Sequence, residues 1–124
     1  MKTSKDYLDE ANKVVNKIDM NVALEKHKNN SAIFIDVRDS SDIAETGTIT
    51  GALKIQRGLI EFVADDSHGL HNKALKKDSE IILVCGAGGQ AALTGKTLVD
   101  MGYSNVSNVG AISDWENKGG PMTK

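Results

Sequence analysis

The only cysteine of this 124-residue chain lies where its chemistry can be controlled. Cys85 follows the apolar, β-prone run 81–84, and a turn with glycines at 86, 88 and 89 separates it from a helical pattern. Backbone N–H groups of such a turn can converge on the sulfur, and the start of the helix adds partial positive charge. Both effects favour the thiolate over the thiol, so Cys85 is predicted to be a nucleophile or a sulfur carrier.

A buried structural cysteine that packs as a small hydrophobic residue is the alternative interpretation. Packing alone does not require three glycines among the four residues that follow Cys85. A loop that must bring its amides close to a bound group does require such residues. The pattern therefore favours a reactive cysteine, which we expect to be partly accessible to solvent.

Composition narrows the class of protein. The length fits one domain that buries a core without disulfides or metals. The chain is 40% hydrophobic and 26% charged, and its net charge of −2 gives no electrostatic footprint for nucleic acid. No apolar run has the length of a membrane span or of a signal peptide, and a lone cysteine forms no internal disulfide. We expect a cytoplasmic monomer with no membrane partner.

The elements that position Cys85 are predicted to alternate between strand and helix. Strands are expected over 32–37, 52–55 and 80–84, with a short extended piece over 15–18 and a last short strand at Val106 and Val109. Longer helices are expected over 5–15, 21–27, 58–64, 89–101 and 112–118. Another short helix, capped by Ser40 or Ser41, is expected to end at Gly47.

Two of these strands, 32–37 and 80–84, are apolar on both faces, which is typical of parallel sheets covered by helices. The predicted fold is α/β: a central parallel β-sheet of about five strands with helices on both faces. It forms one domain over 1–124, and residues 1–14 are an N-terminal helical extension. Ligands of such sheets bind at the carboxyl ends of the strands, where Cys85 is placed. The core is expected to include Trp115 and inward-facing Val22, Ala23 and Leu24.

Several motifs in this order resemble those of the rhodanese family of single-domain sulfurtransferases. Asp36-Val37-Arg38-Asp39 is similar to the family's Asp-Val-Arg-Glu, and Cys85 to Ala91 is similar to its active-site loop. Residues 48–52 lie where the family has Gly-His-Ile-Pro-Gly-Ala. Residues 110–115 with Gly120-Pro121 resemble the closing Gly-Gly, Trp and Gly-Pro pattern. Residues 56–62 also resemble an Arg-Gly-x-x-Glu-Phe segment of a bacterial subgroup.

The resemblance implies a sulfurtransferase that needs no metal and no cofactor. Cys85 would accept a sulfane sulfur as a persulfide and pass it to a thiol or cyanide. The donor would be thiosulfate or a protein persulfide. The sulfur would lie in a cradle formed by Gly86, Ala87, Gly88, Gly89, Gln90 and Ala91.

The loop departs from the family pattern in its charge. Active loops of the family usually carry an arginine five residues after the cysteine, and often a basic residue directly after it. Here Gln90 and Gly86 stand at those positions. Neutral hydrogen bonds are roughly half as strong as charge-assisted ones, so activity with the thiosulfate dianion is predicted to be weak.

Three charged residues are candidates for supporting the site. Asp36 and Arg38 either form a buried ion pair that anchors the end of a strand or orient the active site. Arg57 either replaces the missing loop arginine or is a solvated surface residue. A metal site is not expected, because no further ligand has metal-site spacing around the histidines and aspartates at 65, 66, 68 and 71.

Two other functions are alternatives to sulfur transfer. A phosphatase or arsenate reductase needs a cysteine loop one residue longer that ends in arginine, and Ala91 stands at that position. A non-catalytic rhodanese-like module that holds or senses a persulfide remains an alternative. Acceptance of sulfur by Cys85 at a useful rate would distinguish the two.

Overall fold

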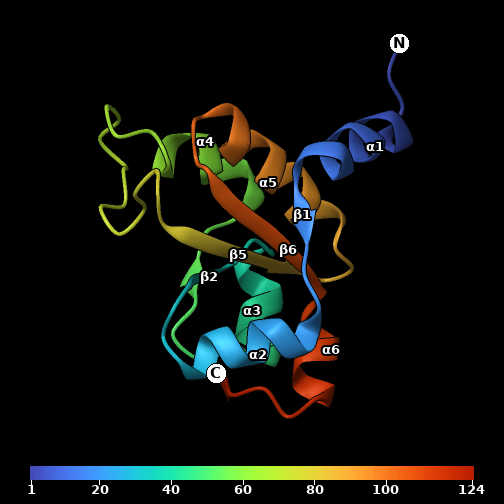
Figure 1. The fold of residues 1–124 in the computed structure, drawn as a ribbon, viewed down its shortest axis with the longest axis vertical. Helices are drawn as coiled ribbons and strands as arrows, with labels where there is room; N and C mark the ends of the chain where they lie inside the picture. Colours follow the sequence, from blue (N-terminus) through green and yellow to red (C-terminus); the bar gives the residue numbers. More distant parts are fainter.

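Five parallel strands form the central sheet of the computed structural model, which describes residues 1–124 (Figure 1). Across the sheet the order is β1 (Asn16–Lys17), β6 (Asn105–Ala111), β5 (Glu80–Cys85), β2 (Ile33–Asp36) and β4 (Leu53–Lys54). All four neighbouring pairs are parallel. The predicted parallel sheet of about five strands is confirmed, and Cys85 ends its middle strand.

Helices cover both faces of the sheet, as predicted. Figure 1 shows α1 (Ser4–Val14), α4 (Ile60–Val63) and α5 (Gly89–Asp100) on one side. On the other side are α2 (Met20–Lys28), α3 (Ser40–Thr46) and α6 (Ile112–Asn117). No helix has both the length and the apolar character needed to cross a membrane.

Side chains of β5 alternate between the two layers, because successive residues of a strand point to opposite faces. Ile81, Leu83 and Cys85 join the core on the α5 side, whereas Ile82 and Val84 join the core against α2 and α6. All five residues are almost completely buried, as expected for a strand covered on both faces. The alternation directs the Cys85 side chain toward the helical layer that contains α5.

Three details of the predicted helices differ in the structure. Val22 is 44% exposed, whereas Met20 and Ala23 are buried, because three consecutive helical residues cannot share one narrow inward face. The residue that caps α3 is Asp39, whose extended backbone precedes the helix, and neither Ser40 nor Ser41 takes that role. The predicted helix over 58–64 is divided into a 3₁₀ turn, η1 (Arg57–Leu59), and α4.

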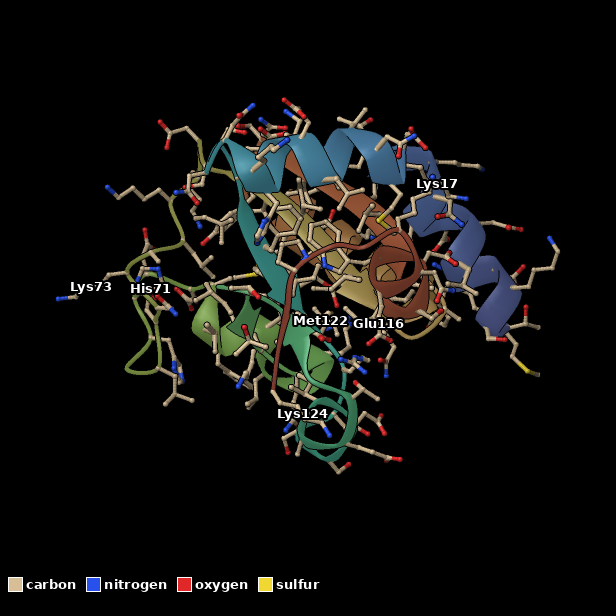
Figure 2. The ribbon with its side chains drawn as sticks, turned by 90° about the horizontal axis from the view of Figure 1, so that it is seen from below. Lys17, His71, Lys73, Glu116, Met122 and Lys124 are labelled. Carbon is tan, nitrogen blue, oxygen red and sulfur yellow. The ribbon has the colours of Figure 1, made fainter.

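A second, two-stranded sheet was not predicted. β3 (Thr48–Ile49) pairs antiparallel with β7 (Met122–Thr123), near the C-terminal segment where Figure 2 labels Met122 and Lys124. Trp115 is fully buried as expected, and its Nε1–H donates to the Pro121 carbonyl at 3.1 Å. The closing segment therefore fastens α6 to the region that follows α3.

The irregular segment 65–78 is held to the α5 side of the domain. The Tyr103 hydroxyl, just beyond α5, donates to the Ala64 carbonyl at 2.8 Å, where this segment begins. Burial, together with the charges of Asp66 and Asp65, raises the pKa of Tyr103 above its usual value. The neutral phenol is therefore the form that stabilises this connection.

Candidate active site

The sulfur of Cys85 lies in a small cradle of backbone N–H groups. Its Sγ accepts hydrogen bonds from Gly88 N–H at 2.9 Å and from Ala91 N–H at 3.4 Å. Gly88 precedes α5, and Ala91 belongs to the first turn of that helix. The positive end of the α5 dipole therefore adds to the two direct contacts, and both favour negative charge on the sulfur.

Cys85 is only 1% exposed, so the expectation of a partly accessible cysteine is wrong. The strand directs the side chain into the core, where it packs with Leu83 and Ala91. Gly86 and Ala87 are exposed instead. The loop and the core thus enclose the sulfur, while the first two residues of the loop face solvent.

The loop lies so close to β6 that two glycines face each other. Gly88 has φ +99° and Gly110 has φ +93°, a left-handed conformation that side chains rarely adopt. A Cβ added to Gly88 would lie 3.6 Å from Gly110 Cα. Glycine at 88 therefore permits both the turn and the orientation of the N–H group toward Sγ.

Asn108 holds this loop from the neighbouring strand, and the sequence analysis did not identify it. Its Nδ2 donates to the Gly88 carbonyl at 3.0 Å, and its Oδ1 accepts from Gly110 N–H at 2.8 Å. It is 6% exposed. The available signal was the polar pair Ser107-Asn108 between Val106 and Val109 in a predicted strand, since buried polar side chains need hydrogen-bond partners.

An irregularity between β5 and β6 gives Asn108 this position. Leu83 pairs with Asn108, but Val84 pairs with Gly110, so Val109 is one residue too many on β6. Such a bulge bends the strand and redirects its side chains, and bulges are frequent next to active sites. Asn108 is thereby a positioning residue for the peptide whose N–H contacts the sulfur.

The cradle contains no cationic side chain. Gln90 is exposed, and the other loop residues are Gly86, Ala87, Gly88, Gly89 and Ala91. Any stabilisation of charge on Sγ therefore comes from peptide dipoles and from the α5 terminus. This arrangement suits a single negative charge on sulfur better than it suits a free dianion.

Asp36 and Arg38 form the buried ion pair that was one of their two predicted roles. Arg38 Nη2 lies 2.8 Å from Asp36 Oδ2, and the two side chains are 7% and 0% exposed. Thr48 Oγ1 donates to the same Asp36 oxygen at 2.7 Å, while Arg38 Nη2 also donates to the Gly47 carbonyl. These contacts tie the end of β2 to β3, and neither residue hydrogen-bonds the cysteine loop.

Arg57 is directed away from the cradle. Its Nη1 pairs with Glu61 at 3.2 Å, and its Nη2 donates to Thr97 Oγ1 at 3.2 Å. Thr97 lies six residues beyond Ala91 on α5, about 9 Å along the helix axis. In this structure, the Arg57 charge therefore serves the contact of η1 with α4, through Glu61, and with α5, through Thr97.

No cluster of three or more His, Cys, Asp or Glu side chains is arranged to hold a metal ion. The histidine and aspartate segment at 65–71 is instead engaged in local turn contacts. Asp65 accepts from Ser67, which lowers the pKa of that carboxyl, and His68 Nδ1 accepts from Leu70 N–H.

The sequence matches the family model of the rhodanese-like domain over residues 20–118. A protein of unknown function from Rhodopseudomonas palustris, described as a possible tyrosine phosphatase, is 29% identical with a TM-score of 0.93; the match covers 99% of this chain and 96% of that one.

Two named sulfurtransferases share the fold. A human single-domain sulfurtransferase is 22% identical with a TM-score of 0.74, over 84% of this chain and 97% of that one. A homodimeric polysulfide-sulfur transferase from Wolinella succinogenes is 24% identical with a TM-score of 0.75, over 96% and 85% of the two chains. No curated protein matches the sequence significantly.

Proposed function

This chain belongs to the rhodanese-like domain family, and on that premise we propose that it is a sulfurtransferase with Cys85 as the sulfur-carrying nucleophile. The observation that carries the proposal is the pair of N–H groups, from Gly88 and Ala91, on one sulfur at the end of a strand. A cysteine that serves only as packing has no need of such donors. The likeness to sulfurtransferase structures supports the same class of reaction.

The proposed reaction has two displacements at sulfur. The Cys85 thiolate attacks the sulfane sulfur of the donor, a new S–S bond forms, and the donor leaves with the electron pair of its broken bond. An acceptor thiolate then attacks the outer sulfur of the persulfide, and Cys85 departs as a thiolate. Covalent catalysis of this kind divides one transfer into two easier steps.

Gly88 and Ala91 contribute by holding the charge that appears on Sγ. Each hydrogen bond to a charged group is worth about 1.5–3 kcal/mol, and the bonds are already oriented before the reaction. The charge on Sγ is lost when the persulfide forms and returns when the acceptor removes the outer sulfur. The same two N–H groups therefore assist Cys85 as the leaving group of the second step.

The uncharged loop bears on the choice of donor. Thiosulfate brings two negative charges, and the cradle offers them no cationic partner. A neutral or protein-borne persulfide does not need such a partner. Thiosulfate is therefore proposed as a weak donor and a protein persulfide as a better one.

Two other functions receive less support. The family match and the sulfurtransferase neighbours favour transfer over a non-catalytic persulfide-binding module. A phosphatase, the function suggested for the Rhodopseudomonas protein, would need an arginine at the end of its loop for the oxyanion. Ala91 has no group that can take that role here.

Intact-protein mass spectrometry tests the proposal. The protein is incubated separately with thiosulfate, with mercaptopyruvate and with the persulfide form of a cysteine desulfurase. We expect an added mass of one sulfur atom, about 32 Da, that thiol reductants remove. The Cys85→Ser variant should gain no such mass while keeping the circular dichroism of the parent. Absence of the adduct with all three donors would contradict sulfur transfer.

A further inference from the structure

A pocket of about 380 Å³ opens beside the cysteine loop. One wall is the loop itself, at Ala87, Gly88 and Gly89, and the opposite wall is α1, at Leu8 and Asn12. The ends of β1 and β6 complete it. Cys85 is not a lining residue: it lies behind Gly88, whose N–H reaches the sulfur.

Much of this pocket comes from residues that precede the family match. Leu8, Asn12, Lys17 and Ile18 all lie before residue 20, where that match begins. The pocket is therefore a feature that the N-terminal segment adds to the domain.

Close packing fixes α1 against the loop and α5. A Cβ on Gly95 of α5 would lie 2.8 Å from both methyl groups of Val15, so a glycine is needed at that contact. At the other end, Leu8 Cδ2 lies 3.7 Å from the Cβ position of Gly89. The pocket wall is thus held by a close contact at Val15 and lies beside the loop at Leu8.

Lys17 supplies the only formal charge among the lining residues. It pairs with Asn108 in the parallel ladder between β1 and β6, so the two side chains lie on the same face of the sheet. Asn108 uses that face to reach Gly88, which places Lys17 beside the loop. Figure 2 shows Lys17 where the chain passes from α1 to α2.

The charge of Lys17 is not compensated. Six Lys or Arg side chains form salt bridges, and Lys17 is not one of them. No aspartate or glutamate lines the pocket. The pocket therefore favours a ligand with a negative charge at its β1 end, while Leu8 and Ala87 offer apolar surface to a carbon chain.

We propose that this pocket binds the sulfur acceptor, a small organic thiol that carries a carboxylate or sulfonate, with the anionic group at Lys17. The proposal rests on sulfur transfer as the function. The volume lies within the roughly 300–1,000 Å³ typical of small-molecule sites, more than a lone inorganic anion needs. Since Gly88 lines the pocket and its N–H also contacts the sulfur, the thiol end of the acceptor is placed against the loop that holds the persulfide.

The chemical step balances without another reactant. The thiolate of the bound acceptor attacks the outer sulfur of the Cys85 persulfide, and a new S–S bond forms. The bond between that sulfur and Sγ breaks, and its electron pair stays on Sγ, where Gly88 and Ala91 N–H hold the charge. The acceptor leaves as a persulfide.

A single-turnover experiment on the persulfide form of the full chain tests this assignment. The acceptors are 3-mercaptopropionate, which is anionic, and 2-mercaptoethanol, which is not. Relative to the parent, Lys17→Gln should slow transfer to 3-mercaptopropionate by roughly tenfold and leave transfer to 2-mercaptoethanol nearly unchanged, since only the charge-assisted contact is lost. Lys13→Gln is the matched control, because Lys13 is an exposed lysine of α1 outside the pocket.

A binding measurement separates failure of the pocket from failure of the function. Amide chemical shifts of the Cys85→Ser protein are followed during titration with 3-hydroxypropionate, which has no thiol. Shifts at Leu8, Lys17 and Gly89 that Lys17→Gln abolishes would support the pocket, whether or not the parent forms a persulfide. Equal effects of Lys17→Gln on both thiols, or no shifts at these residues, would overturn it.

Discussion

Two neighbouring strands of the sheet, β2 and β5, end beside different electrostatic partners. β2 ends at Asp36, whose carboxylate is buried against the Arg38 guanidinium and the Thr48 hydroxyl. β5 ends at Cys85, whose sulfur accepts hydrogen bonds from the N–H groups of Gly88 and Ala91 and has no charged partner. The chain uses full charges at one strand end and peptide dipoles at the next.

The two strand ends differ in role: the ion pair at β2 stabilises the fold, whereas the N–H groups at β5 serve a sulfur that reacts. Asp36 and Arg38 satisfy one another so fully that a change of charge on either would leave the other unpaired in the core. The cradle around Sγ stabilises a negative charge without any fixed counter-charge, so the sulfur can lose that charge and regain it at modest cost. A site whose Sγ must give up its negative charge when it becomes the inner sulfur of a persulfide, and later regain it, is better served by the second arrangement.

The largest expected effect is on stability, at the charged strand end. Arg38→Ala leaves Asp36 buried without its partner and should lower the free energy of unfolding by about 3–5 kcal/mol, measured by urea denaturation. Lys5→Ala, which breaks the exposed pair with Asp9, is the control and should leave the free energy of unfolding nearly unchanged. The folded fraction of Arg38→Ala should still load sulfur. A stable Arg38→Ala protein that cannot load sulfur would place Arg38 in the reaction and remove the contrast.

The next largest effect is expected when a positive charge is added to the loop that follows β5. Gln90→Arg gives thiosulfate a charge-assisted contact worth about 1.5–3 kcal/mol, so kcat/KM for thiosulfate should rise by roughly one to two decades. A protein persulfide donor should gain much less. Gln90→Met, of similar length and without charge, should gain nothing with either donor. An equal rise for every donor would show that arginine rearranges the loop and does not recognise the dianion.

The sequence predicts the elements that end at the site, but it does not predict the contacts that distant segments make with them. The apolar runs of β2 and β5, and the glycines after Cys85, report local structure, and they predicted the sheet and the loop. The partner of that loop, Asn108, depends on a bulge between β5 and β6, which no local pattern encodes. The pairing of β3 with β7 joins the middle of the chain to its end, and the pocket needs α1 to pack across α5.

A smaller effect should follow from releasing the loop while leaving its charge alone. Asn108→Leu leaves the Gly88 carbonyl and Gly110 N–H without their buried partner, at a cost of about 1–3 kcal/mol, and should slow sulfur loading of Cys85 by up to about tenfold. In Asn108→Asp the carboxylate still accepts from Gly110 but cannot donate to Gly88.

The aspartate variant makes the positioning role testable by pH. Its protonated carboxyl can donate to the Gly88 carbonyl again, so its loading rate relative to the parent should rise as the pH is lowered. The ratio to the parent removes any pH dependence that the two proteins share. If Asn108 supported stability alone, both variants would lose stability and this ratio would stay constant.

The smallest effect is expected at Arg57, the arginine that does not belong to the buried Asp36–Arg38 pair. Arg57 is engaged with Glu61 and Thr97, and an ion pair this exposed contributes about 0.2–1 kcal/mol. Arg57→Gln should therefore change the free energy of unfolding by less than about 1 kcal/mol. It should leave kcat/KM for thiosulfate within about twofold of the parent. Its effect should add to that of Gln90→Arg, because sites more than roughly 7–10 Å apart with no shared partner act independently. If Arg57→Gln instead abolished thiosulfate turnover and Arg57→Lys restored it, the guanidinium would have to leave Glu61 and reach the loop. Arg57 would then supply a positive charge to the cysteine loop during the reaction, and the two strand ends would differ only in the protein without substrate.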